Sequence, residues 1–153
     1  MRADVQLACD AWEAGLPDAE RLVVEAAAVV GGDREAAVLL ADDETVRGLN
    51  WRFRHKDEAT NVLAFPAPSN LDGFAGDIVL AHGVVTGEAA AQGKPAADHL
   101  RHLVIHGLLH LNGYDHIQDA DAETMEALER ELLSQLGIPD PYADGHAPVP
   151  ADR

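Results

Sequence analysis

Four short apolar or alternating stretches of the chain predict β-strands. Residues 5–9 alternate apolar and polar side chains, which is typical of a strand with one buried face. Three further runs are largely apolar and are bounded by residues that favour turns, namely 36–41, 61–65 and 75–81. The pattern therefore predicts a small four-stranded sheet.

Apolar side chains at helical spacing predict helices between and after these strands. An Ala- and Val-rich run begins at Pro17 and ends before Gly31, a residue type that is common just beyond a helix. The other helical segments are a short one after Asp42, the sequence from residue 84 onward, and longer ones at 95–111 and 119–136. Because strands and helices do not alternate strictly, we predict an α+β fold, with a small four-stranded mixed sheet and helices packed over one face.

Length and composition predict a single globular domain. The chain has 153 residues, of which 47% are hydrophobic and 25% are charged, close to the averages of globular proteins. We expect the domain to span residues 1–138 and the Pro-rich residues 139–153 to form a loosely ordered tail. The sequence has no run of about 18 apolar residues and no basic-flanked leader, and Cys9 is its one cysteine. We therefore expect a cytoplasmic protein with no membrane partner.

The net charge restricts the nucleic-acid roles that the chain can have. Eleven Lys and Arg stand against 27 Asp and Glu, which gives a formal net charge of −16 at pH 7 with His neutral. Such a surface repels nucleic acid on average, because the phosphate backbone is also negative. Any nucleic-acid role therefore needs a local basic patch.

One stretch of the chain does concentrate positive charge. Four of the eleven basic residues lie within ten positions: Arg47, Arg52, Arg54 and Lys56. Arginine suits a two-pronged grip on a phosphate, so this basic stretch could form an anion site. Cations near the end of a helix also offset its dipole, by about 0.3–1 kcal/mol each. The residues alone leave both interpretations open.

The most specific chemical signal is the segment HGLLHLNGYDH at residues 106–116. His106 and His110 are four positions apart, so their rings share one face of a helix, and Gly113 lets the chain turn so that His116 can approach. Three imidazoles leave one open position on a Zn²⁺ ion, which is the arrangement of a catalytic rather than a structural site. We therefore predict that these three histidines hold a metal ion.

The same histidine spacing occurs in metzincin peptidases, with one difference. In those enzymes a glutamate that acts as general base follows the first histidine, whereas this chain has Gly107 there. The difference counts against peptide hydrolysis and leaves a metallopeptidase with this spacing as an alternative. Two further histidines, His99 and His102, precede the triplet and are interpreted as cleft-lining or solvated.

Taken together, these segments resemble the YbeY family of bacterial metal-dependent endoribonucleases, which act in ribosomal RNA maturation. The resemblance lies in LNWRFRHKDEATNVLAFP at 49–66, GDIVLA at 76–81 and the histidine segment. It covers about residues 5–137, with one departure at Ala64, where the family usually has Ser. It implies a small mixed sheet with helices, and a metal cleft formed by the histidine-bearing helix and the turn that follows.

The resemblance also implies an activity and its residues. The implied ligands of one Zn²⁺ per chain are His106, His110 and His116; the expected catalytic residues are Arg54 and His110; and the expected substrate-binding residues are Arg52, Arg54 and Lys56. The implied activity is cleavage of single-stranded ribosomal RNA, in late maturation of the 16S rRNA 3′ end and in ribosome quality control. The expected partners are this RNA and the small ribosomal subunit with its basic proteins, and no DNA is expected. A non-catalytic ribosome-assembly module stays open as an alternative, because an acidic surface also suits basic proteins.

Overall fold

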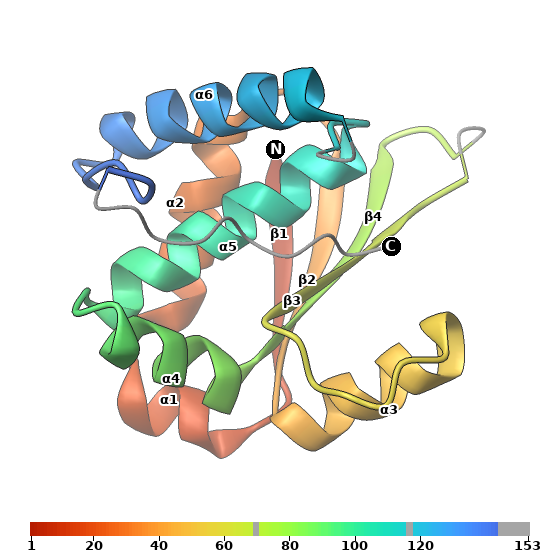
Figure 1. The fold of residues 1–153 in the computed structure, drawn as a ribbon. Helices are drawn as coiled ribbons and strands as arrows, with labels where there is room; N and C mark the ends of the chain where they lie inside the picture. Colours follow the sequence, from red (N-terminus) through yellow and green to blue (C-terminus); the bar gives the residue numbers. More distant parts are fainter. Residues whose placement is uncertain (69–70, 116–117, 144–153) are drawn as a thin grey trace.

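The computed structural model describes residues 1–68, 71–115 and 118–143, which form a sheet of strands covered by helices (Figure 1). The elements in chain order are β1 (Arg2–Leu7), α1 (Asp10–Gly15), α2 (Ala19–Val30), β2 (Glu35–Ala41), α3 (Asp43–Arg54), β3 (Val62–Pro66), β4 (Phe74–Ala81), α4 (His82–Ala91), α5 (Ala96–Leu111) and α6 (Asp119–Gln135). Across the described ranges, no helix is both long and apolar enough to cross a membrane.

The strands of the described residues form a mixed sheet in the order β1-β2-β4-β3. Strand β2 pairs in parallel with β1 and with β4, whereas the edge strand β3 runs antiparallel to β4. This arrangement confirms, for the described residues, the predicted α+β class with a four-stranded mixed sheet. Strand β1 lies earlier than the alternating pattern at 5–9 indicated, because its register with β2 runs from Arg2 opposite Glu35 to Leu7 opposite Leu40.

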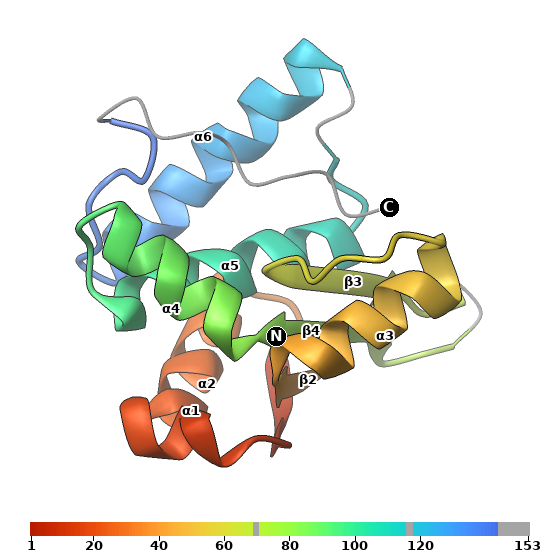
Figure 2. The ribbon, with the colours of Figure 1, turned by 60° about the horizontal axis from the view of Figure 1, so that its bottom comes forward.

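Helix α5 runs across one face of the sheet and lies at the centre of the core. It packs on β3 and β4 and is flanked by α2, α4 and α6 (Figures 1 and 2). Nearly all of its side chains from His99 to Leu111 are buried. The close approach to the sheet depends on Gly107, because a Cβ atom there would lie 3.1 Å from Ile78 Cγ2 and 3.3 Å from Val62 Cγ2. The fold thus encloses the helix that carries the histidines.

Helix α3 lies on the opposite face of the sheet, so the prediction of helices over one face alone is wrong. Its Val46 packs with Leu63 and Val79 in a small second apolar cluster. The physical reason is that β3 and β4 are apolar on both faces, and each face therefore needs a cover. Asp42 caps this helix by accepting a hydrogen bond from the Thr45 backbone N–H at 2.8 Å. The helix ends at Arg54, close to the edge strand β3.

Helix α1 is the element that the sequence pattern did not predict. It has six residues, too few for a helical period to be recognised. Its Trp12 is fully buried, and the indole Nε1–H donates to the Ala41 carbonyl oxygen at 2.8 Å. This one side chain anchors the segment against the end of β2.

The beginning of the Pro-rich tail contacts the domain. Pro141 is buried, and the Tyr142 hydroxyl donates a hydrogen bond of 2.8 Å to Glu129 Oε1 on α6. The Tyr142 ring also meets the His102 ring edge to face, with centroids 5.6 Å apart. Residues 144–153, where the rest of the expected tail falls, lie outside the described residues.

Candidate metal centre

His106 and His110 form a buried pair one turn apart on α5. Their Nε2 atoms are 3.1 Å apart, and the two side chains are 2% and 9% exposed. Two ligands that bind one Zn²⁺ at about 2.0–2.1 Å in tetrahedral geometry lie roughly 3.3 Å from each other. The observed separation is close to this value, so the pair fits a zinc ion without rearrangement of the helix.

Glu129 of α6 holds the ring of His106 from the other side. Its Oε2 lies 3.4 Å from His106 Nδ1, and its Oε1 lies 2.6 Å from His102 Nε2. Burial raises the pKa of the Glu129 carboxyl, but hydrogen bonds from His102 and His106 outweigh burial and hold that pKa well below its usual range. The charged carboxylate therefore accepts the Nδ1–H of His106, which leaves Nε2 of that ring to face His110.

The third predicted ligand, His116, lies outside the described residues. The turn that leads toward it is described as far as Asp115. Gly113 has a φ of +96°, which reverses the chain after α5, and the Tyr114 N–H donates to the Leu109 carbonyl oxygen at 3.0 Å. Within the described ranges, no three His, Cys, Asp or Glu side chains form a group that could hold a metal ion. The histidine pair is thus the described part of the predicted site.

Arg54 and His110 line the same pocket, which has a volume of about 370 Å³. The Arg54 guanidinium donates from Nη2 to the Ala64 carbonyl oxygen of β3 at 2.7 Å and lies 5.2 Å from the centroid of the Phe65 ring. The other lining residues are Ala64, Pro66, Gly113, Tyr114 and Asp115. The fold therefore brings the predicted arginine beside the predicted metal-binding helix, although the two are far apart in the sequence.

The other basic side chains of this stretch are not among the described residues that line the pocket. Arg52 and Lys56 are exposed, and the Arg52 guanidinium lies 5.8 Å from the centroid of the Phe53 ring. Arg47 is held by Asp57, with 2.7 Å between Nε and Oδ1. Of the predicted phosphate contacts, the structure places Arg54 beside His110, and it places Arg52 and Lys56 outside this pocket.

The interpretation of His99 and His102 as cleft-lining or solvated is wrong. Each side chain is 3% exposed, and each Nε2 faces a carboxylate from a neighbouring helix. His99 Nε2 lies 2.9 Å from Glu88 Oε1 on α4, and His102 Nε2 lies 2.6 Å from Glu129 Oε1 on α6. Burial lowers the pKa of His102, so the neutral ring donates its Nε2–H to the carboxylate.

Three residues of this buried polar network were not singled out from the sequence: Glu88, Glu129 and Tyr142. For Glu129 the sequence did contain a signal. It lies four residues after Met125 and three before Leu132, on the apolar stripe of α6, where a carboxylate needs a buried partner. Glu88 and Tyr142 gave no such signal, because their partners lie on other elements and no local sequence pattern links them.

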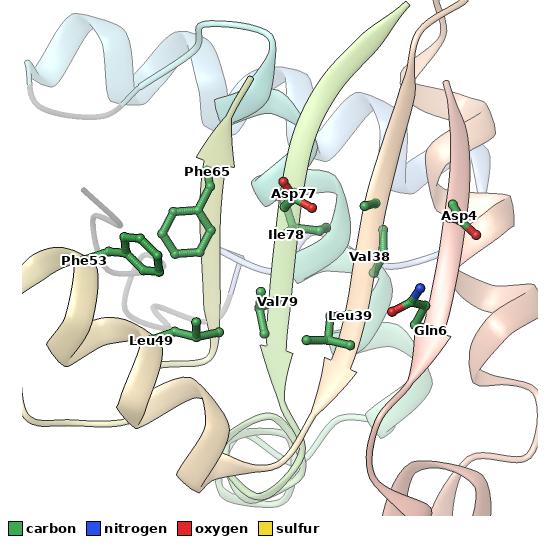
Figure 3. Close-up of a pocket in the computed structure, with 11 residues that line it drawn as sticks. Asp4, Gln6, Val38, Leu39, Leu49, Phe53, Phe65, Asp77, Ile78 and Val79 are labelled. Carbon is green, nitrogen blue, oxygen red and sulfur yellow. The ribbon is translucent and has the colours of Figure 1, made fainter. Parts of the chain in front are cut away.

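A second pocket, of about 480 Å³, lies on the opposite face of the sheet and contains none of the predicted site residues (Figure 3). Its walls include Phe53 of α3 and Phe65 of β3, which point toward each other with ring centroids 5.4 Å apart. Asp77 of β4 also lines it, and burial raises the pKa of that carboxyl. Alternation along β3 therefore turns Phe65 to this face, while Ala64 and Pro66 line the pocket with His110.

Gly107 faces the sheet, not the pocket. It occupies the position of the metzincin general base, but Ile78 and Val62 stand 3.1 and 3.3 Å from where its Cβ would be. A glutamate there would have to place its side chain between α5 and the sheet. The packing of α5 on β3 and β4 thus leaves little room at this position for the side chain of a general base.

We predict that Gly107→Glu destabilises the fold and creates no peptidase activity. Burying an unpaired carboxylate against the sheet should lower the free energy of unfolding by about 3 kcal/mol or more. Chemical denaturation measures this loss, and a casein assay measures peptide hydrolysis. Gly87→Glu is the matched control, because Gly87 is also helical but has nothing within 4 Å of its Cβ position. A folded, casein-cleaving Gly107→Glu protein would contradict this interpretation.

The fold and this pocket together define a class of protein. An α+β domain whose helix carries a buried histidine pair, one member of which shares a pocket with an arginine, is suited to metal-assisted hydrolysis at a phosphate. The sequence profile of the family described as Endoribonuclease YbeY matches residues 9–137. The chain belongs to this family of metal-dependent endoribonucleases, hydrolases that act on RNA.

Individual relatives agree with the family match. The chain is 48% identical over 159 residues to an Endoribonuclease YbeY of Rhodopseudomonas palustris strain BisB5, covering 92% of this chain and 81% of that protein. It is 57% identical over 116 residues to the Endoribonuclease YbeY of Pseudomonas putida KT2440, covering 73% and 74%. The solution structure of TM1509 from Thermotoga maritima has the same fold, with a TM-score of 0.61, 24% identity, and coverage of 95% of this chain and 99% of that one.

Proposed function

We propose that this endoribonuclease cleaves single-stranded ribosomal RNA with one zinc ion per chain, held by His106, His110 and His116. The proposed setting is the cytoplasm, in late maturation of the 16S rRNA 3′ end and in ribosome quality control. The small ribosomal subunit is the proposed partner. The net charge of −16 favours contacts with its basic proteins in addition to its RNA.

One observation carries this proposal: Arg54 and His110 line the same pocket. A phosphate held by the arginine would lie next to the face of α5 on which the two histidine Nε2 atoms are 3.1 Å apart. Since the rest of the surface is strongly acidic, this pocket is where the described residues best combine a phosphate-binding cation with metal-binding nitrogens.

The residues of the pocket have separate parts in the proposed reaction. When bound, the zinc ion supplies Lewis-acid activation of water and of a phosphate oxygen. Arg54 grips the phosphate with its planar fork and offsets the negative charge that develops during cleavage. Its hydrogen bond to the Ala64 carbonyl oxygen fixes the guanidinium at the edge of β3. Asp115 lines the pocket and places there a carboxylate that can hold a proton.

Cleavage assays on matched RNAs test the proposal. The purified protein should cut single-stranded RNA, leave a duplex of the same sequence intact, lose activity on chelation and regain it when zinc is restored. A variant with His106, His110 and His116 all replaced by alanine should be inactive, which controls for a contaminating nuclease. Cleavage that persists in this variant would contradict the metal assignment. Zinc-loaded protein that cuts neither RNA, yet binds the small subunit, would favour the non-catalytic module.

A further inference from the structure

One buried carboxylate, Glu129, joins two histidines of α5 to the C-terminal turn. Its Oε1 is 2.6 Å from His102 Nε2 and 2.8 Å from the Tyr142 hydroxyl, and its Oε2 is 3.4 Å from His106 Nδ1. Glu129 is 1% exposed, and His102 and His106 are 3% and 2% exposed. The carboxylate thus has three donors and almost no contact with water.

This arrangement has a defined effect on His106. A carboxylate can only accept hydrogen bonds, so Nδ1 of His106, which faces it at 3.4 Å, is the nitrogen that carries the N–H. The lone pair then lies on Nε2, and this nitrogen faces Nε2 of His110 at 3.1 Å. In metal sites, a partner on the far nitrogen of a histidine fixes both the tautomer and the plane of the ring.

Stability alone is a weak reason for a carboxylate at this position. Removing a charge from water costs free energy that its partners offset only in part, and apolar side chains of similar volume are often as stable or more so. Three neighbours of Glu129 on its face of α6, Met125, Leu132 and Leu133, are apolar and buried. An apolar side chain at position 129 would therefore suit the packing of this helix. We infer that the carboxylate serves a purpose other than stability.

We propose that Glu129 is a positioning residue for the metal centre, and that it holds His106 in the tautomer and orientation that present Nε2 to the metal. This inference rests on the assignment of His106 as a ligand in the proposed function. Tyr142 completes the arrangement, because its hydroxyl and His102 both donate to Oε1 and leave Oε2 directed at His106.

The chain offers a matched control in Glu88 of α4, which pairs with another histidine of α5. Glu88 accepts from His99 Nε2 at 2.9 Å, and Asn61 Nδ2 donates to the same carboxylate at 3.1 Å. His99 is as buried as His102, and neither His99 nor Glu88 is among the described residues that line the pocket with His110. Glu88→Gln therefore removes a similar carboxylate–histidine pair that includes none of the proposed ligands.

Two measurements on Glu129→Gln and Glu88→Gln test the inference. In the metal-free protein, ¹H–¹⁵N spectra of the imidazole rings should show His106 protonated on Nδ1 in the wild type and in Glu88→Gln. In Glu129→Gln this single tautomer should be lost. Zinc affinity, measured by competition with a chromophoric chelator, should fall about tenfold to a hundredfold in Glu129→Gln and stay within about twofold of wild type in Glu88→Gln.

The outcomes separate this inference from the proposed function. If the wild type binds no zinc but shows the His106 tautomer and its loss in Glu129→Gln, the positioning holds and the metal assignment fails. If the wild type binds zinc and Glu129→Gln binds it equally well with an unchanged tautomer, the role of Glu129 is overturned. Should Glu129→Gln not fold, Tyr142→Phe replaces it, since that variant loses one donor to Oε1 and should weaken zinc binding severalfold; unchanged affinity there would also overturn the inference.

Discussion

The His110→Ala variant is expected to retain almost no zinc, whereas the wild-type protein should bind about one ion per chain. Two remaining histidines, one of them His106, make a poor site because zinc needs at least three protein ligands to stay bound in water. Elemental analysis after gel filtration measures the ratio. The variant should also lose the thermal stabilisation that zinc gives the wild type, which is about 2.7 kcal/mol when the free metal is at a hundred times its Kd.

His55→Ala serves as the matched control for this loss. His55 is exposed at the end of α3 and is not among the residues that line the pocket with His110. Its replacement should leave the zinc content and the zinc-dependent stabilisation unchanged. A full complement of zinc in His110→Ala would refute the assignment of the ligands, while the fold and the family would stand.

The Arg54→Ala variant is expected to keep its zinc and to lose RNA cleavage by about a hundredfold or more. That range is typical when a single group that stabilises developing charge is removed. The variant also loses the hydrogen bond to the Ala64 carbonyl oxygen, so a decrease in stability of about 1 kcal/mol is expected beside the kinetic effect. Single-turnover cleavage of a short RNA measures the kinetic effect, with zinc content measured on the same sample, and chemical denaturation measures the change in stability.

Two further variants show whether the loss of cleavage comes from losing the planar guanidinium group or from losing a positive charge. Arg54→Lys should restore only part of the activity, because an ammonium group cannot grip a phosphate with two parallel bonds. Arg47→Ala removes the same charge from the same helix, but Arg47 is bound to Asp57, so cleavage should stay near the wild-type rate. If Arg54→Ala and Arg47→Ala are equally active, the basic residues act only by offsetting the helix dipole.

Local sequence patterns predicted most elements but not how they cover the sheet. Helices such as α5 and α6 span several turns, so their apolar spacing is evident, and their ends are marked by residues such as Pro95 and Gly137. Helix α1 is too short for such a signal. The position of α3 on the second face was missed because it depends on contacts of Val46 with Leu63 and Val79, which the sequence of α3 alone does not show.

The candidate site was predictable where its residues are close in sequence. His106 and His110 follow from helical spacing, since residues four apart share a face. The placement of Arg54 beside them depends on the sheet order, which sets β3 at the edge next to the end of α5. The burial of His99 and His102 could not be read from their own helix, because the carboxylates that pair with them belong to α4 and α6.

Because α5 is enclosed, the part of the site around His106 is expected to have a higher local stability than the part around Arg54. The backbone amides around His106 are covered by the sheet and by three helices, so we expect them to exchange with solvent only when the whole domain unfolds. Arg54 is anchored by one hydrogen bond to an edge strand and belongs to a helix that packs on the smaller apolar cluster. Opening of that edge costs less free energy than opening of the core. The pocket therefore joins a side chain carried by the enclosed helix, His110, to one anchored on an edge strand, Arg54.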